Sequence, residues 1–184
     1  MNSLDLVESR YDFFLIWGHG LQHKDKIIEL IAKEEMFEIV MIIKHEAKNI
    51  KKLVKKVYEH DYVPYFHLKG KTKYLINTPR EVMFIFVKNK HPREVWKLGH
   101  DTAHIESELM VGYKNIIRDM FNDKKDDRRE ENHVIHASDN ELQVHHLLKY
   151  LGYDEGIYRF DRHKNKPFEV PHFIEIFDVY RIHK

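Results

Sequence analysis

The residues around His136 combine a reactive side chain with a predicted helix start. His136 lies two residues before Ser138, and Ser138 with Glu141 has the spacing of a capping box, in which Ser is the N-cap and Glu occupies position N3. A helix N-terminus carries unpaired N–H groups and a partial positive charge, so phosphates bind there. A neutral histidine at that point can attack phosphorus through a ring nitrogen. The alternative is that His136 only ends a strand and Ser138 only caps a helix.

Two other histidines have the spacing of a metal site. His100 and His104 are four residues apart, so on a helix they would share a face and could chelate a divalent cation. Further ligands would have to come from Glu106, Glu108, His133 or His136. Two ligands without a defined third bind metal weakly, so we expect no resident metal ion. The alternative is a solvated helix face.

The composition restricts the classes of function. The 184 residues include 15 His and no Cys, which excludes disulfides, Cys-zinc sites and thiol nucleophiles. The 31 Lys and Arg residues nearly balance 30 Asp and Glu residues, which argues against a nucleic-acid partner because such domains usually carry a cationic excess. The first residues do not have the pattern of a secretory signal, and no apolar run approaches the roughly 18 residues of a membrane span. We therefore expect a cytoplasmic protein.

The strongest patterns in the chain predict strands and helices of one sheet. Apolar runs rich in aromatic and β-branched residues predict strands at 12–17, 37–43 and 82–87, which we expect to be neighbours. Helical spacing of apolar residues predicts helices at 24–33 and 47–58 that pack on this sheet. We expect these elements to form the core.

Weaker patterns give the remaining elements. Residues 63–76 read as short extended pieces around Gly70, and residues 100–121 look mixed with a helical tendency. Pro92 suits the first turn of a helix. That helix would include Val95, Trp96 and Leu98. The remaining segments are an exposed loop of eight charged residues at 124–131, a helix from Ser138 to about Gly152, and a last strand within 173–182.

This order of elements predicts an α/β sandwich. Strands and helices alternate along the chain, which favours one mainly antiparallel sheet with helices on one face. A ferredoxin-like sheet built from split βαβ units is the simplest candidate. We expect a single domain over residues 1–184, with a core at 12–152 and a C-terminal extension at 153–184 that packs as a loop and a strand.

The His136 segment resembles a motif of the nucleoside diphosphate kinases. Their phosphate-accepting histidine lies in an Asn-x-x-His-Gly-Ser-Asp-Ser stretch that opens a helix, and residues 136–140, His-Ala-Ser-Asp-Asn, are similar to it. Other segments resemble the family in the same order along the chain: 13–16, 24–33, 36–44, 81–88, 95–99 and 115–119. In the last of these, Arg118 matches an arginine that contacts phosphates. The resemblance implies the fold of these kinases and a role for His136 as nucleophile.

Other positions depart from the family pattern. The Lys-Pro-Asp stretch that ends the first strand is Trp17-Gly18-His19 here, so the phosphate-binding lysine is absent. The arginine expected before the Lys-Leu-x-Gly stretch is Trp96, and the asparagine three residues before the histidine is His133, with Asn132 adjacent. The glutamate that orients the imidazole falls at Leu147.

The prediction that follows is an enzyme that transfers a phosphoryl or nucleotidyl group. Its substrate would be a nucleotide or a nucleotide-activated compound, and Mg²⁺ would bind together with that substrate. The protein could form a homo-oligomer. His136 would be nucleophile or general acid/base. Phosphate would be bound by Arg118, His19, Lys97, His100 and Ser138. The alternatives are a non-catalytic module that binds a nucleotide or a protein, and a metal hydrolase that uses His100 and His104.

Overall fold

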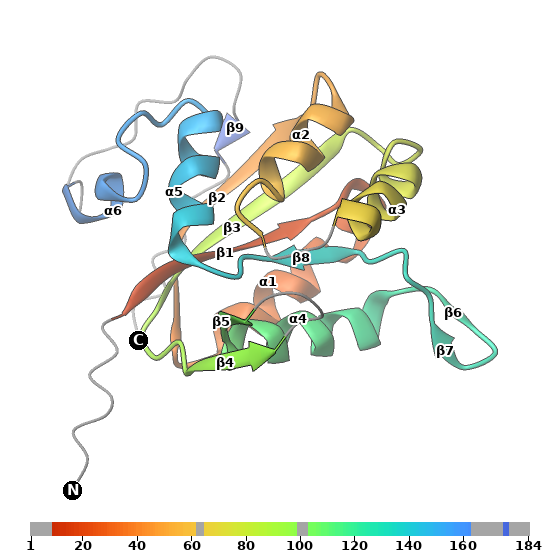
Figure 1. Ribbon diagram of the computed structural model, residues 1–184, viewed down its shortest axis with the longest axis horizontal. Coiled ribbons are helices and arrows are strands. Elements are labelled where there is room, and N and C mark those ends of the chain that lie inside the picture. The colour runs from red at the N-terminus through yellow and green to blue at the C-terminus, as the bar shows by residue number, and fades with distance from the viewer. Residues whose placement is uncertain (1–8, 62–64, 99–102, 163–174, 177–184) are drawn as a thin grey trace, which may run out of the picture.

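A five-stranded antiparallel sheet forms the centre of the protein (Figure 1). The computed structural model describes residues 9–61, 65–98, 103–162 and 175–176. The strands run in the order β8-β1-β3-β2-β9. Their bounds are β1 Arg10–Ile16, β2 Phe37–Glu46, β3 Glu81–Asn89, β8 Ile135–Ala137 and β9 Glu175–Ile176.

The strand order is that of two interleaved split βαβ units. The chain passes from β1 through α1 (Lys24–Lys33) to β2, and β3 occupies the gap between them. It then passes from β3 through α4 (Glu108–Phe121) to β8, and β1 occupies that gap. Every paired strand in the sheet is antiparallel to its neighbour. The predicted ferredoxin-like α/β sheet, with 12–17, 37–43 and 82–87 side by side, is confirmed.

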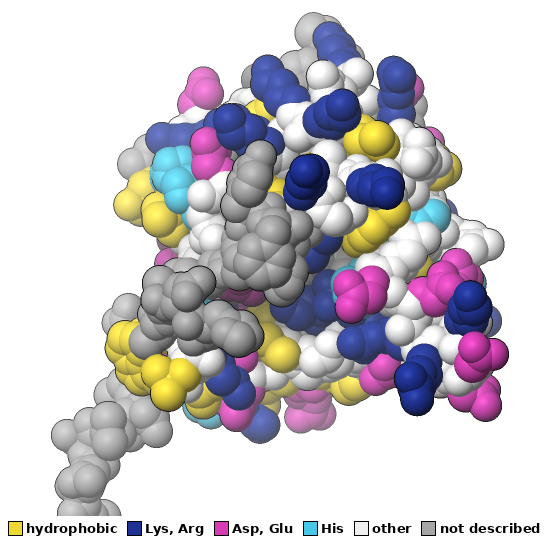
Figure 2. Space-filling view, turned by 45° about the vertical axis from the view of Figure 1, so that its right-hand side comes forward, with side chains coloured by type: hydrophobic (Ala, Val, Ile, Leu, Met, Phe, Trp, Pro, Cys, Tyr) yellow, Lys and Arg dark blue, Asp and Glu magenta, His cyan; other side chains and the backbone are white. Residues whose placement is uncertain are grey.

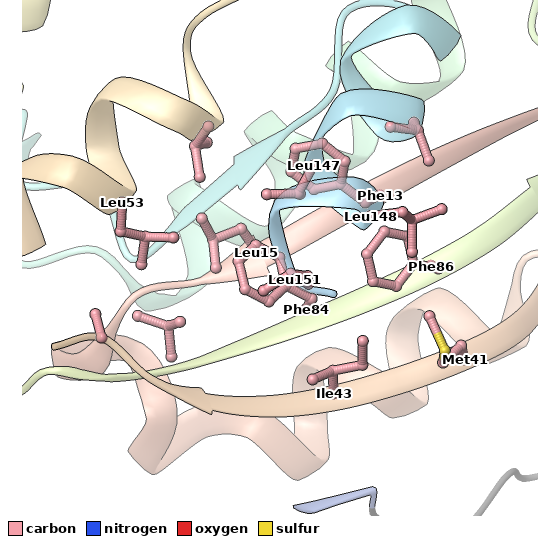
Figure 3. Packing of buried hydrophobic residues seen from close by; sticks show 14 of the residues in the cluster. Phe13, Leu15, Met41, Ile43, Leu53, Phe84, Phe86, Leu147, Leu148 and Leu151 are labelled. Atoms are coloured by element: carbon pink, nitrogen blue, oxygen red, sulfur yellow. The ribbon is translucent and has the colours of Figure 1, made fainter. Parts of the chain in front are cut away.

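Helices cover both faces of the sheet, so the prediction of one covered face was wrong. Ile27 of α1 and Ile117 of α4 pack in one cluster with alternate residues of β1 and β3. The other face is covered by α2 (Ile50–Val57) and α5 (Glu141–Tyr150). Figure 3 shows Leu53 of α2 on the side of Leu15, and Leu147 of α5 over Phe13, in the cluster that also contains Phe84. Because β1 and β3 are buried on both faces, their runs are continuously apolar.

Segments predicted from weak patterns differ most from the structure. Residues Tyr65–Leu75 form helix α3 rather than extended pieces, because Leu68 and Leu75, seven residues apart, share a face that packs on the core. The helix predicted after Pro92 is wrong. Arg93 has a φ of 49°, which a right-handed helix cannot contain, and β4 (Glu94–Leu98) follows it. This strand pairs with β5 (Ala103–Ser107), which ends at α4.

The remaining elements are short. The exposed loop predicted at 124–131 is exposed but forms a hairpin of β6 (Lys124–Lys125) and β7 (Arg128–Arg129). A 3-10 helix, Gly18–His23, links β1 to α1, and α6 (Tyr158–Arg162) follows α5. The last strand predicted within 173–182 is β9, paired to β2, and its other residues lie outside the described part. Among the described helices, none has the length and apolar character needed to cross a membrane.

Candidate functional site

The outer edge of β8 is the place where the predicted site residues His136 and Arg118 meet. The Val134 carbonyl accepts from Trp17 N–H just after β1, Ser138 N–H donates to the Phe13 carbonyl, and His136 pairs with Leu15. Because alternate residues of a strand direct their peptide groups to opposite sides, those of Ile135 and Ala137 point away from the sheet. Arg118 of α4 donates from Nε and Nη2 to the Ile135 carbonyl, at 3.2 and 3.0 Å. The guanidinium is therefore fixed beside the residue that precedes His136.

The segment that enters β8 is held by Asn122 of the α4 C-terminus. The Asn122 amide donates to the Glu130 carbonyl at 3.0 Å and contacts Nδ1 of His133 at 2.8 Å, while its oxygen accepts from Val134 N–H at 3.1 Å. Burial, followed by the positive charge of Arg118 and other cations, lowers the pKa of His133 to about 3. His133 is therefore a neutral, structural histidine.

His136 is buried rather than open to solvent. Its exposed fraction is 2%, and its ring contacts Phe13 and Tyr58. Nε2 lies 3.4 Å from the amide nitrogen of Gln143 and 3.7 Å from Oδ2 of Asp61. Burial lowers the pKa of His136 well below its usual value, and the nearby charges of Lys71, Lys114 and Arg118 lower it further. The imidazole is therefore neutral.

Gln143, rather than a residue at position 147, lies beside the imidazole of His136. Its amide is held by two backbone groups, because Oε1 accepts from Asp139 N–H at 2.9 Å and Nε2 donates to the Val57 carbonyl at 2.6 Å. The nitrogen facing His136 is thus a donor, which favours the tautomer with its lone pair on Nε2. Gln143 lies one helical turn before Leu147, which packs in the core.

Cations outnumber anions around His136. Lys71 projects from the inward side of α3, and its Nζ lies 4.5 Å from the centre of the Tyr58 ring. Lys114 lies one turn before Arg118 on α4 and thus on the same helix side. Burial lowers the pKa of Lys71 to about 8 and also lowers the pKa of Arg118. Figure 2 shows Lys and Arg side chains recessed in a hollow, with acidic and histidine side chains beside them.

Two carboxyl groups lie among these cations. Asp61 follows α2, and its side chain is 1% exposed, whereas that of Asp139, before α5, is 12% exposed. Burial and a hydrogen bond to Asp139 raise the pKa of Asp61 to about 8, so Asp61 is protonated at neutral pH. Lys114 Nζ lies 4.0 Å from Asp139 Oδ1. The three basic side chains therefore have one acidic side chain besides Asp61 among them, and this excess of basic groups suits a bound anion.

Ser138 has a structural role instead of the predicted capping role. Its hydroxyl donates to Asp12 Oδ1 at 2.9 Å and accepts from Phe13 N–H at 3.0 Å. The cap of α5 is Asn140, whose side chain accepts from Gln143 N–H. The predicted N3 residue, Glu141, accepts from Tyr11 N–H at 2.8 Å. The capping box was therefore wrong, because both of its side chains bond to β1.

The other predicted site residues that the structure describes, His19 and Lys97, contact partners other than His136. His19 contacts the Asn132 carbonyl at 3.4 Å and the Tyr74 ring edge, and burial lowers its pKa. Lys97 is half-exposed on β4 and lies 3.8 Å from Glu106. His104 lies on β5, so the helix-face geometry proposed for it is wrong, and His100 lies outside the described residues. Within the described ranges, no three side chains of the metal-binding types form a metal site.

Sequence reasoning missed much of the site. The missed residues are Tyr58, Asp61, Lys71, Lys114, Asp139 and Gln143. Asp139 belongs to the motif around His136, but the sequence analysis gave its side chain no role. Two of them had a readable signal: Lys114 precedes Arg118 by four residues, and Gln143 lies in the first turn of the helix after His136. Asp61 and Lys71 had none, because the segment that joins them was interpreted as extended.

The chain resembles solved nucleoside diphosphate kinases at low sequence identity. That of Aquifex aeolicus aligns with a TM-score of 0.49 and 12% identity over 78% of this chain and 94% of its own. That of Borrelia burgdorferi, a transition-state mimic with bound vanadate and ADP, gives 0.44 and 12% over 77% and 85%. That of Encephalitozoon cuniculi gives 0.44 and 13% over 82% and 95%. The sequence matches no model of a known protein family and no curated protein.

Proposed function

We propose that this protein transfers a phosphoryl or nucleotidyl group from a nucleotide or nucleotide-activated compound, with His136 as its reactive side chain. The observation that carries the proposal is the excess of positive charge around a neutral imidazole. Lys71, Lys114 and Arg118 all act on His136, and Asp139 supplies the negative charge among them. A phosphate group would balance these charges and would lie beside a ring nitrogen.

The residues divide into binding and reacting groups in this proposal. His136 would attack phosphorus through Nε2 while the bond from that phosphorus to the oxygen of the rest of the nucleotide breaks, or it would exchange a proton at Nε2, because its lone pair faces the polar cluster. Arg118 would bind phosphate oxygens, and Lys71 would supply the lysine charge that the sequence does not provide at residues 17–19. Mg²⁺ would bind to the phosphates of the substrate, since Asp61 and Asp139 are hydrogen-bonded to each other.

A non-catalytic nucleotide-binding module is the second candidate. It is favoured by the 2% exposure of His136, because a nucleophile must reach its substrate. The same cations would then hold a phosphate group without turnover. Both candidates require the anion site, and they differ only in whether His136 reacts.

Phosphorus NMR of the protein with a panel of nucleotides and nucleotide-sugars distinguishes the candidates. His91→Ala is the matched control, because His91 is an exposed histidine in the loop before β4. Turnover in wild type and His91→Ala, with loss in His136→Ala, supports the transferase. Phosphate binding without turnover of any compound supports the module. Turnover that persists in His136→Ala contradicts the role given to His136.

A further inference from the structure

Helix α2 has an outer side made of lysines. Five of the nine residues from 48 to 56 are lysine, and none is acidic. All four apolar residues of α2 are buried in the core, so its lysines lie on the opposite, outer side of the helix. Figure 2 shows Lys and Arg side chains gathered at the top of the molecule, where Figure 1 places α2. This surface, the lysine face, consists of Lys48, Lys51, Lys52, Lys55 and Lys56.

Most of the charges on the lysine face are not offset by acidic partners. Lys56 pairs with Glu59 at 2.7 Å, whereas no ion pair in the described part of the chain involves the other four lysines. Lys51 and Lys55 are four residues apart on α2, and a like-charged pair at this spacing destabilises a helix. Lys51 and Lys52 also lie in the first helical turn, where the helix dipole disfavours cations. These lysines therefore lower the stability of α2, which is typical of residues that serve a function.

The overall charge of the chain does not describe this surface. The formal charge is +1, which argues against a nucleic-acid partner only when the charges are evenly distributed. At physiological ionic strength, exposed charges separated by more than about 8 Å are largely screened from each other. A polyanion that approaches α2 therefore interacts with the lysine face rather than with the balanced charge of the whole chain.

The lysine face is suited to a ligand that is recognised by its charge alone. No apolar or aromatic side chain of α2 is exposed, so this helix offers neither the apolar anchors of a protein interface nor the aromatic platforms that bind single strands. It cannot insert an apolar side into a bilayer, because that side packs in the core. A nucleic-acid duplex presents about one negative charge per 1.7 Å of its axis. The eight residues of α2 extend for about 12 Å, along which a duplex carries about seven phosphates.

We infer that the lysine face binds the phosphate backbone of a nucleic-acid duplex without sequence preference. Lysine acts on phosphate as a point charge, and it reads no base when it contacts the backbone. The inference does not depend on the phosphate site beside His136, because the lysine face lies on the exposed side of α2. Its failure would therefore leave the proposed function intact.

Fluorescence anisotropy with two short DNA duplexes of unrelated sequence tests this inference. Wild type should bind both duplexes with similar affinity, and its affinity should fall as salt is added. The variant Lys51→Gln/Lys52→Gln/Lys55→Gln should bind at least about tenfold more weakly at low salt. Its slope of log affinity against log salt should be smaller by about 2–3, because each neutralised phosphate contributes about 0.9.

Lys24→Gln/Lys26→Gln/Lys33→Gln is the matched control. It removes the same charge from α1, which packs on the opposite face of the sheet, and should bind as wild type does. Urea unfolding should show the α2 variant to be at least as stable as wild type, since the charges that it removes repel one another. The inference would be overturned by no binding to wild type, by wild-type affinity in the α2 variant, or by an equal loss in the two variants. Tighter binding of a single strand than of its duplex would also overturn it.

Discussion

Replacement of Lys71 by methionine is expected to stabilise the protein and to remove its affinity for phosphate. Burial lowers the pKa of Lys71 from 10.5 to about 8, which corresponds to a cost of at most about 3 kcal/mol for the charged form. Loss of the contact with the Tyr58 ring offsets about 0.5–2 kcal/mol of the gain. Methionine keeps the apolar stem, so we expect a net increase of about 1–2 kcal/mol in the free energy of unfolding.

The direction of the pH dependence follows from the same shift. The folded protein holds the Lys71 proton less tightly than the unfolded chain, so the cost is complete below about pH 8 and disappears between about 8 and 10.5. The stability gained by Lys71→Met should therefore be largest at neutral pH and decrease as the pH rises through that window. Urea unfolding followed by fluorescence measures it, with buried Trp17 as the reporter.

Phosphate provides the second half of this test. It should raise the midpoint of unfolding of wild type but not of Lys71→Met, because a ligand stabilises only the form that binds it. Lys73→Met, an exposed change on the same helix, should behave as wild type in both respects. The reasoning would be refuted if Lys71→Met were less stable than wild type at neutral pH. It would equally be refuted if phosphate raised the unfolding midpoint of Lys71→Met as much as that of wild type.

Three further changes test the framework around the site, each by urea unfolding. Ser138→Ala should destabilise the protein by about 1–3 kcal/mol, because it removes the hydroxyl that donates to Oδ1 of the buried Asp12 and accepts from Phe13 N–H; an effect below about 0.5 kcal/mol would contradict this. Asp61→Asn should remove a loss of stability that wild type shows as the pH rises from about 4 to about 8, since the folded state keeps that proton; an unchanged profile would be the opposing result. Gly18→Ala should cost about 1–3 kcal/mol, because its Cβ would lie 2.2 Å from the Pro79 carbonyl oxygen. Gly112→Ala, in open space on α4, should instead add about 0.5–1 kcal/mol, and equal effects of the two would refute the steric argument.

The central strands could be predicted from sequence because their signal is unambiguous. β1 and β3 are buried on both faces, so their apolar runs stand out, and α1 has the predicted bounds of 24–33. The hairpin of β4 and β5 could not be predicted, because Pro92 is equally suited to a helix start and only the positive φ of Arg93 excludes one. Trp96 and Leu98 are also 73% and 92% exposed. The apolar residues of β4 therefore do not mark a buried face, although a buried face is what apolar periodicity in a sequence normally indicates.

The site was only partly predictable, for a physical reason. His136 and Arg118 belong to local patterns, and the structure brings them together at the edge of β8. The charge balance depends instead on Lys71 of α3 and on Asp61, which lies in the segment after α2. Both reach the site only through tertiary packing. Ser138 illustrates the opposite case, because its local helix-start pattern is overridden by a bond to a buried carboxylate of another strand.

Titration calorimetry of inorganic phosphate into wild type and Arg118→Ala tests the central claim most directly. The account predicts saturable binding to wild type and a loss of about 1.5–3 kcal/mol in Arg118→Ala, the range for a hydrogen bond to a charged group. Arg129→Ala is the matched control, because Arg129 is an exposed arginine on β7, paired with Asp119. Binding to Arg118→Ala with wild-type affinity, or no binding to wild type, would contradict the existence of a phosphate site beside His136.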